Sequence, residues 1–197
     1  MTYDFMAGLM EVEDPHYSKM KAMVMDVDFD PNQTDGISLL QREIARPDIL
    51  QLLLERKANP ETTGAYLWDT PMQMAASQGR VETLQTLIEF DGKVNPPFRM
   101  GGNAPPLHLA ALGGHKDAVQ LLLKNGADCL LSVTQISSQA SGLARQFAAK
   151  NGNEEIVKIL EEAEARAKAE GKVERAWEDI DADSQFAPFA PLTKAAE

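Results

Sequence analysis

A short sequence pattern occurs twice in the middle of this chain, 35 residues apart. The first copy begins at Thr70 and reads TPMQMAASQGRVETLQTLIEFDGKVN, and the second begins at Pro105 and reads PPLHLAALGGHKDAVQLLLKNGAD. In both copies a proline-led apolar stretch ends in Ala-Ala, a glycine follows, and an acidic residue opens a second apolar stretch. A repeat of this length is one structural unit that must stack on its neighbours, because it cannot bury its apolar residues alone.

Both stretches of the repeat have the sequence pattern of a helix. Pro71 and Pro106 stand at the start of the first helix, where the backbone N–H that proline lacks has no partner within the helix. Gly79 and Gly114 stand at its end, where the chain often takes a left-handed conformation that favours glycine. The paired alanines are small enough for neighbouring repeats to approach closely along this helix. The second helix carries apolar residues spaced by three and four positions, which predicts one buried face: Leu84, Leu87 and Ile88 in one copy and Val119, Leu122 and Leu123 in the other.

This pattern resembles the ankyrin repeat, which is a turn and two helices with a period of about 33 residues and a T-P-L-H-x-A signature. The resemblance implies an all-α fold, an ankyrin-repeat solenoid of about four to five helix-turn-helix repeats with degenerate caps. It also implies that His108, in the histidine position of the signature, hydrogen-bonds to turn backbone, and that His115 has a structural role of the same kind. Since ankyrin solenoids are binding surfaces, we expect a protein–protein interaction module and not an enzyme.

Weaker copies extend the pattern in both directions. Upstream, residues 48–60 match the second helix, but the first helix before them is short, with Gln41 and Arg42 near the expected Ala-Ala. Downstream, residues 142–166 keep Ala-Ala and the apolar stripe but lack the Pro-Leu-His start, as capping repeats often do. We therefore expect a degenerate N-terminal capping repeat over 1–34, ankyrin repeats over 35–166, a C-terminal helical extension over 167–180 and an acidic, proline-broken tail over 181–197.

The aromatic residues near the C-terminus allow two interpretations. Trp177, Ile180, Phe186 and Phe189 are spaced along an acidic segment, as in a linear motif that a partner reads. They can also fold back and cover the open apolar face of the last repeat. We favour the second interpretation, because an uncapped solenoid end is an aggregation hazard.

The formal net charge of −11 belongs to the two ends of the chain. Residues 1–35 and residues 153–197 each carry a net charge of −6, whereas residues 36–152 carry +1. An acidic chain is repelled by phosphate backbones, so we expect no nucleic-acid ligand. The charge favours a protein partner with a basic surface, since complementary charge speeds encounter, although acidic ends also serve solubility.

Composition argues against several other classes of protein. There is no run of 18 apolar residues and no apolar signal segment, so we expect neither membrane association nor secretion. A single cysteine, Cys129, fits a reducing compartment, and we expect a monomer in the cytoplasm, with the nucleus as the alternative.

No residue set predicts a catalytic, cofactor or metal site. The acidic run through Asp26, Asp28 and Asp30 begins like a calcium loop, but Pro31 and Ile37 stand where that loop needs glycine and glutamate. The three histidines and one cysteine of the chain have no zinc-ligand spacing.

Candidate partner-binding residues lie in two turns and on the first helices. The turns before Thr70 and Pro105 concentrate aromatic, arginine and methionine side chains, which are typical of binding hot spots, although they can instead pack between adjacent turns. The candidates are Tyr66, Trp68, Phe98, Arg99 and Met100 from the turns, and Ser77, Gln78 and Leu112 from the first helices.

Two alternatives to an adaptor remain open. The chain can be a structural or regulatory subunit whose acidic tail is read by another domain. It can also be a small-molecule-binding protein or unusual enzyme with a pocket between the repeat turns and the long 129–141 link, where Asp69, Arg99 and His108 would converge.

Overall fold

A computed structural model of the chain describes residues 15–26, 28–32, 38–63, 69–97, 104–137 and 140–177. Helices dominate this part of the chain, and the strands are few and short. The helices are α1 (Pro15–Val24), α2 (Leu39–Arg42), α3 (Pro47–Glu55), α4 (Pro71–Ser77), α5 (Val81–Glu89), α6 (Pro106–Gly113), α7 (Lys116–Lys124), α8 (Ala144–Lys150) and α9 (Glu154–Ala169). The strands are β1 (Leu131–Ser137), β2 (Ala140–Leu143) and β3 (Arg175–Ala176).

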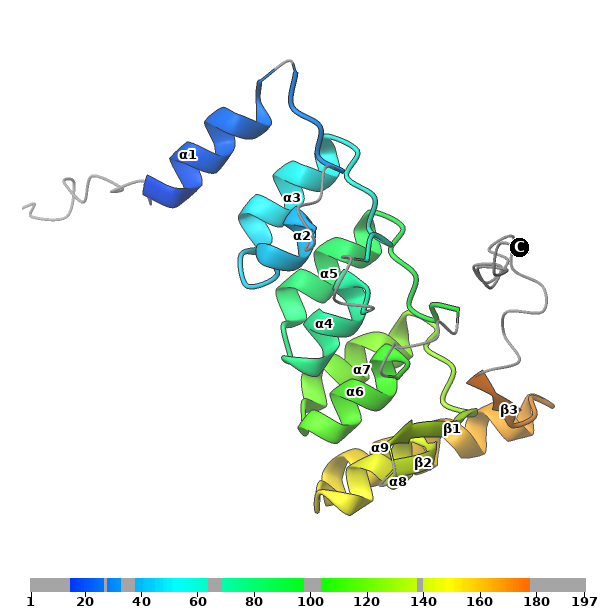
Figure 1. Ribbon diagram of the computed structural model, residues 1–197. Helices are drawn as coiled ribbons and strands as arrows, with labels where there is room; N and C mark the ends of the chain where they lie inside the picture. The colour runs from blue at the N-terminus through cyan, green and yellow to red at the C-terminus, as the bar shows by residue number, and fades with distance from the viewer. Residues whose placement is uncertain are drawn as a thin grey trace, which may run out of the picture.

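The helices form pairs that stack in sequence order, which confirms the expected helical repeat solenoid (Figure 1). The first helices α2, α4, α6 and α8 pack on one another in one row, and the second helices α3, α5, α7 and α9 form a parallel row. Helix α1 packs against α3 and so begins the second row. Each pair therefore contacts its neighbours in the stack, as in other repeat proteins.

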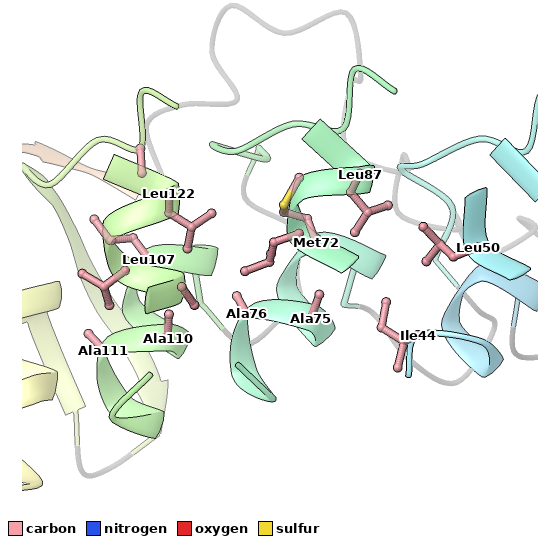
Figure 2. Close-up of a cluster of buried hydrophobic side chains, with 14 of the residues drawn as sticks. Ile44, Leu50, Met72, Ala75, Ala76, Leu87, Leu107, Ala110, Ala111 and Leu122 are labelled. Atoms are coloured by element: carbon pink, nitrogen blue, oxygen red, sulfur yellow. The ribbon is translucent and has the colours of Figure 1, made fainter. Parts of the chain in front are cut away.

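One continuous apolar core runs between the two rows. Figure 2 shows its side chains spread across three successive helix pairs, from Ile44 and Leu50 to Leu107 and Leu122. The paired alanines expected at close contacts, Ala75, Ala76, Ala110 and Ala111, are all 0% exposed. Their small size lets the first helices approach closely, and larger side chains from both rows fill the space behind them.

Glycines at the ends of the first helices are required by geometry. Gly79 has a φ of +65° and Gly114 a φ of +74°, in the left-handed region that side chains disfavour. A Cβ atom on Gly79 would lie 2.5 Å from Nδ1 of His115 in the next repeat. This position therefore needs glycine both for its backbone conformation and for the close approach of the neighbouring repeat.

The two ends of the stack are finished differently. At the start, α1 contributes Met20 and Val24 to the core, and residues 1–14 lie outside the described part of the chain. At the other end, Arg145 stands where Met72 and Leu107 stand in earlier repeats. Its Nε lies 3.2 Å from Oε1 of the buried Glu164 on α9. A charged pair in place of an apolar side chain is suited to a helix pair that has one neighbour instead of two.

The 129–141 link, expected as a long loop, instead contains most of a hairpin. Strand β1 pairs antiparallel with β2, and β3 pairs in parallel with the other edge of β1. The small sheet is an addition to the expected all-α fold. It forms because the link pairs with itself and with a segment more than 30 residues further along the chain.

The helical extension expected over 167–180 is wrong over most of its length. Helix α9 ends at Ala169, Gly171 turns the chain with a φ of +82°, and residues 175–176 form β3. Trp177 does fold back as expected, but it packs against Leu131 and Val133 of the hairpin and not on the outer face of the last repeat. The remaining tail aromatics lie outside the described residues.

Candidate protein-binding surface

Buried polar side chains tie each first helix to the next repeat. Nε2 of Gln41 donates to the carbonyl of Asp69 at 2.6 Å, and Nε2 of Gln73 donates to the carbonyl of Ala104 at 2.8 Å. Nε2 of His108 contacts the carbonyl of Gly142 at 3.2 Å in the same way. These bonds fix the spacing of the first helices and hence of the side chains that project from them.

His108 has the structural role that its sequence position predicted. The ring is 0% exposed and meets Phe147 edge-on, with ring centroids 5.2 Å apart. Burial lowers the pKa of His108 from 6.5 to about 4, against opposing effects of the Gly142 and Leu131 backbone and of the Asp128 charge. Nδ1 has no partner in hydrogen-bonding geometry among the described residues. The neutral ring therefore uses its Nε2–H as the donor to Gly142.

A second set of bonds ties the carboxyl ends of the first helices together. Nε2 of His115 lies 3.0 Å from the carbonyl of Ser77, and the Asn153 side chain donates to the carbonyl of Ala111 at 3.2 Å. The Asn151 side chain donates to the carbonyl of Leu112 at 2.6 Å. The structural role expected for His115 is thus confirmed. These bonds satisfy carbonyls that a helix leaves free at its end.

The candidates on the first helices lie at the surface of that row. Ser77 and Gln78 are exposed, and Leu112 is half-buried. Sequence reasoning missed two half-buried neighbours, Met74 and Leu109, which lie one helical turn before Ser77 and Leu112. Both residues directly follow the buried polar residue of their helix, Gln73 or His108, and this position in the repeat is the signal that could have identified them.

The turn candidates Tyr66, Trp68, Phe98, Arg99 and Met100 lie outside the described residues. The structure does describe the residues that end these turns. The carbonyls of Asp69 and Ala104 are the acceptors for Gln41 and Gln73, so the chain leaving each turn is bonded to the first helix of the preceding repeat. The chain that enters α4 and the chain that enters α6 are therefore each fixed to the preceding first helix.

A groove lies elsewhere, between α7, α9 and the segment 171–176. Its volume is about 1270 Å³, and from the 129–141 link it is lined by Cys129 and Leu131. Asp69 does not line it, and the buried His108 does not either. This groove is therefore not the small-molecule pocket in which Asp69 and His108 were expected to come together.

The acidic run at the start of the chain forms local turns. The carboxylates of Asp26 and Asp30 accept the backbone N–H groups of Asp28 and Asn32 at 3.0 and 2.9 Å. Across the described ranges, no three or more His, Cys, Asp or Glu side chains are grouped so that they could hold a metal ion. In the same part of the chain, no helix has the length and apolar character needed to cross a membrane.

The stacked helix pairs define the chain as a helical repeat solenoid. A family model for ankyrin repeats in three copies matches residues 20–133, and a second, for ankyrin repeats in many copies, matches residues 107–161. The chain belongs to the ankyrin-repeat family. Repeats of this family generally mediate protein–protein interaction.

The similar curated proteins share only a segment with this chain. An ankyrin repeat and KH domain-containing protein of Caenorhabditis briggsae is 33% identical over 100 residues, which is 50% of this chain and 4% of that protein. The human transient receptor potential cation channel subfamily A member 1 is 45% identical over 60 residues, 29% of this chain and 5% of the channel. A probable E3 ubiquitin-protein ligase of Oryza sativa subsp. japonica is 31% identical over 108 residues, 55% of this chain and 22% of that protein.

Proposed function

We propose that this chain is an adaptor or dedicated chaperone that binds one protein partner along its first-helix row and the adjoining turns. The observation that carries the proposal is the surface of α4 and α6. Met74, Leu109 and Leu112 offer the exposed parts of half-buried apolar side chains, and Ser77 and Gln78 offer exposed polar groups. An apolar strip with polar neighbours is the composition of a protein interface, where apolar anchors lie inside a polar rim.

The hydrogen bonds beneath this surface support the same function. Gln73 and His108 are buried, and their bonds to the next repeat fix the separation of α4, α6 and α8. A surface held by buried bonds loses little conformational entropy when a partner binds. We include the turn candidates Tyr66, Trp68, Phe98, Arg99 and Met100 in the proposed site because the sequence places them in the turns that precede α4 and α6.

The partner we propose is a protein with a basic surface, because the two ends of the chain that flank the repeats each carry a net charge of −6. We place the protein in the cytoplasm as a monomer. The buried free thiol of Cys129 fits a reducing compartment, since burial raises its pKa and keeps it unreactive. The Arg145–Glu164 pair on the last repeat fits a stack that ends there instead of continuing into a second copy.

The test is affinity capture from native lysate with Gln78→Arg and Leu112→Arg in one variant. A large charged side chain at each position should abolish capture of the specific partner, because it would be buried without a counter-charge. The matched control is Gln85→Arg on α5, which makes the same change at an exposed position of the second-helix row. The control should capture the partner as the parent chain does, and that capture should weaken as ionic strength rises.

A second variant tests the turns. It replaces Tyr66, Trp68, Phe98 and Arg99 by alanine, and its folding is checked by circular dichroism. Loss of the partner from this variant would support the proposed site. Capture unchanged in both variants, or lost equally in the Gln85→Arg control, would contradict it.

A further inference from the structure

The segment after α9 forms a strap that runs back across the turns of earlier repeats. We define this C-terminal strap as residues 172–177. The backbone N–H of Arg175 donates to the carbonyl of Leu130 at 3.0 Å, and the hydroxyl of Ser132 donates to the carbonyl of Arg175 at 3.3 Å. The Arg175 side chain also pairs with Asp128 at 2.7 Å. These contacts attach the strap to the beginning of the hairpin (Figure 1).

Trp177 ends the strap and is almost completely buried. It is 1% exposed and forms an apolar cluster with Leu131 and Val133 that is separate from the main core. Its indole N–H donates to the carbonyl of Pro96 at 2.9 Å, across 81 residues of sequence. Pro96 lies in the segment between α5 and α6, so one side chain joins this segment, the hairpin and the strap.

The neighbouring contacts show that these segments meet at one place. The Asn95 side chain donates to the carbonyl of Gly126 and accepts the N–H of Asp128, both at 2.9 Å. The Arg175 guanidinium in turn holds the carboxylate of Asp128. The segment at Asn95 and Pro96, the turn after α7 and the strap are therefore linked through a continuous set of polar contacts around the buried indole.

We propose that Trp177 is a clasp that closes the C-terminal strap over the hairpin and makes the strap, the hairpin and the Pro96 segment one cooperative unit. An indole is the side chain suited to this position, because it fills a large apolar space and still offers one N–H to a buried carbonyl. Without it, Leu131 and Val133 would lose the third member of their cluster, and β3 would be held by its two paired residues and the polar contacts of Arg175 alone. When the C-terminal strap opens, we expect the hairpin to lose its protection while the helix pairs stay stacked.

The test is amide hydrogen exchange in the full-length chain carrying Trp177→Ala. We expect exchange to become at least tenfold faster at the amides of Asp128, Leu131 and Arg175, which are bonded in this unit. Exchange in α4 and α5 should not change, since the bonds and packing of the strap are made with the hairpin, the turn after α7 and Pro96. Unchanged exchange at the three amides, or equally faster exchange throughout the stack, would overturn the proposal.

A second variant separates the hydrogen bond from the packing. Trp177→Phe keeps an aromatic ring against Leu131 and Val133 but removes the donor to Pro96. We expect acceleration at the same amides that is smaller than in Trp177→Ala. Arg175→Ala serves as the control, because it removes only an exposed ion pair of the strap and should have the smallest effect. An Arg175→Ala effect as large as that of Trp177→Ala would assign the closure to the ion pair and overturn the clasp.

Discussion

The histidine position of the repeat is filled by glutamine in three of its four occurrences, at Gln41, Gln73 and Gln146. Gln73 performs two tasks there, since its Oε1 accepts the N–H of Thr70 at 2.8 Å and its Nε2 donates to Ala104. His108 performs only one. The equivalent of Thr70 is Pro105, which has no N–H to offer, and this explains why Nδ1 of His108 has no hydrogen-bond partner of good geometry among the described residues.

The buried His108 makes stability depend on pH. Its pKa is about 4 in the folded chain, because burial penalises the charged ring, and 6.5 in the unfolded chain. The unfolded chain therefore binds more protons between these values. The stabilisation from the neutral ring is complete above pH 6.5, is lost as pH falls towards 4, and amounts to on the order of 3 kcal/mol.

The measurement is the free energy of unfolding by urea between pH 4 and pH 7, compared with His108→Gln. Glutamine does not titrate and already occupies this position in the other repeats. As pH falls from 7 to 4, the free energy of unfolding of the parent chain should fall by about 3 kcal/mol relative to that of His108→Gln. A difference that stays constant with pH would show that the ring is not buried in its neutral form.

At the scale of the element, the helix pairs follow from local rules and the hairpin does not. Helix α4 begins with Thr70, whose hydroxyl accepts the N–H of Gln73 in a capping box, and Gly79 follows its end in a left-handed conformation. These signals lie within ten residues of one another in the sequence. The contact between repeats adds a second requirement at Gly79, which the next prediction isolates.

We expect Gly79→Ala to be more destabilising than Gly126→Ala. Both glycines have positive φ, of +65° and +85°, so both substitutions cost about 1–2 kcal/mol in backbone strain. Only at Gly79 does the new Cβ meet the ring of His115, whereas nothing lies within 4 Å at Gly126. The clash should add roughly 1–3 kcal/mol, because the bond from His115 to Ser77 limits how far the ring can move.

Urea unfolding of the two variants checks this difference. Equal losses of unfolding free energy would mean that the repeats are farther apart at Gly79 than the structure places them.

At the scale of the whole molecule, stability should depend on position in the stack. Helix α7 lies between α5 and α9, whereas α1 has α3 as its helical neighbour in the described part of the chain. In a solenoid each repeat is stabilised by its neighbours, so a central element cannot open without breaking two contacts. A terminal element can open alone.

Two identical substitutions test this expectation. Val119 on α7 and Val24 on α1 are both 0% exposed, and alanine removes two methyl groups from each, worth about 2 kcal/mol. We expect Val119→Ala to lower the free energy of global unfolding, measured with urea. Val24→Ala should instead accelerate hydrogen exchange in α1 while protection in α5 and α7 stays unchanged. Equal loss of protection in α5 and α7 from both variants would indicate that α1 belongs to the same cooperative unit as the centre.

Part of the candidate surface followed from sequence and part did not. The exposure of Ser77 and Gln78 could be predicted because the position of a residue in the repeat fixes the face of the helix on which it lies. Met74 and Leu109 were not among the predicted surface residues, and an apolar side chain at helical spacing is usually a sign of burial. Their partial exposure depends on how closely the neighbouring first helices approach, which a single repeat does not encode.

The sequence by itself determined the helix pairs, their order and the roles of His108 and His115, because caps, turns and apolar periodicity act over one repeat. Only the tertiary structure decided that β1 pairs with β2 and β3, that α9 stops at Ala169 and that Trp177 reaches Pro96. Strand pairing and a buried indole depend on partners distant in the chain. Trp177 and Pro96 are 81 positions apart, and no local sequence pattern predicts their contact, which exists because the stack brings the two segments together.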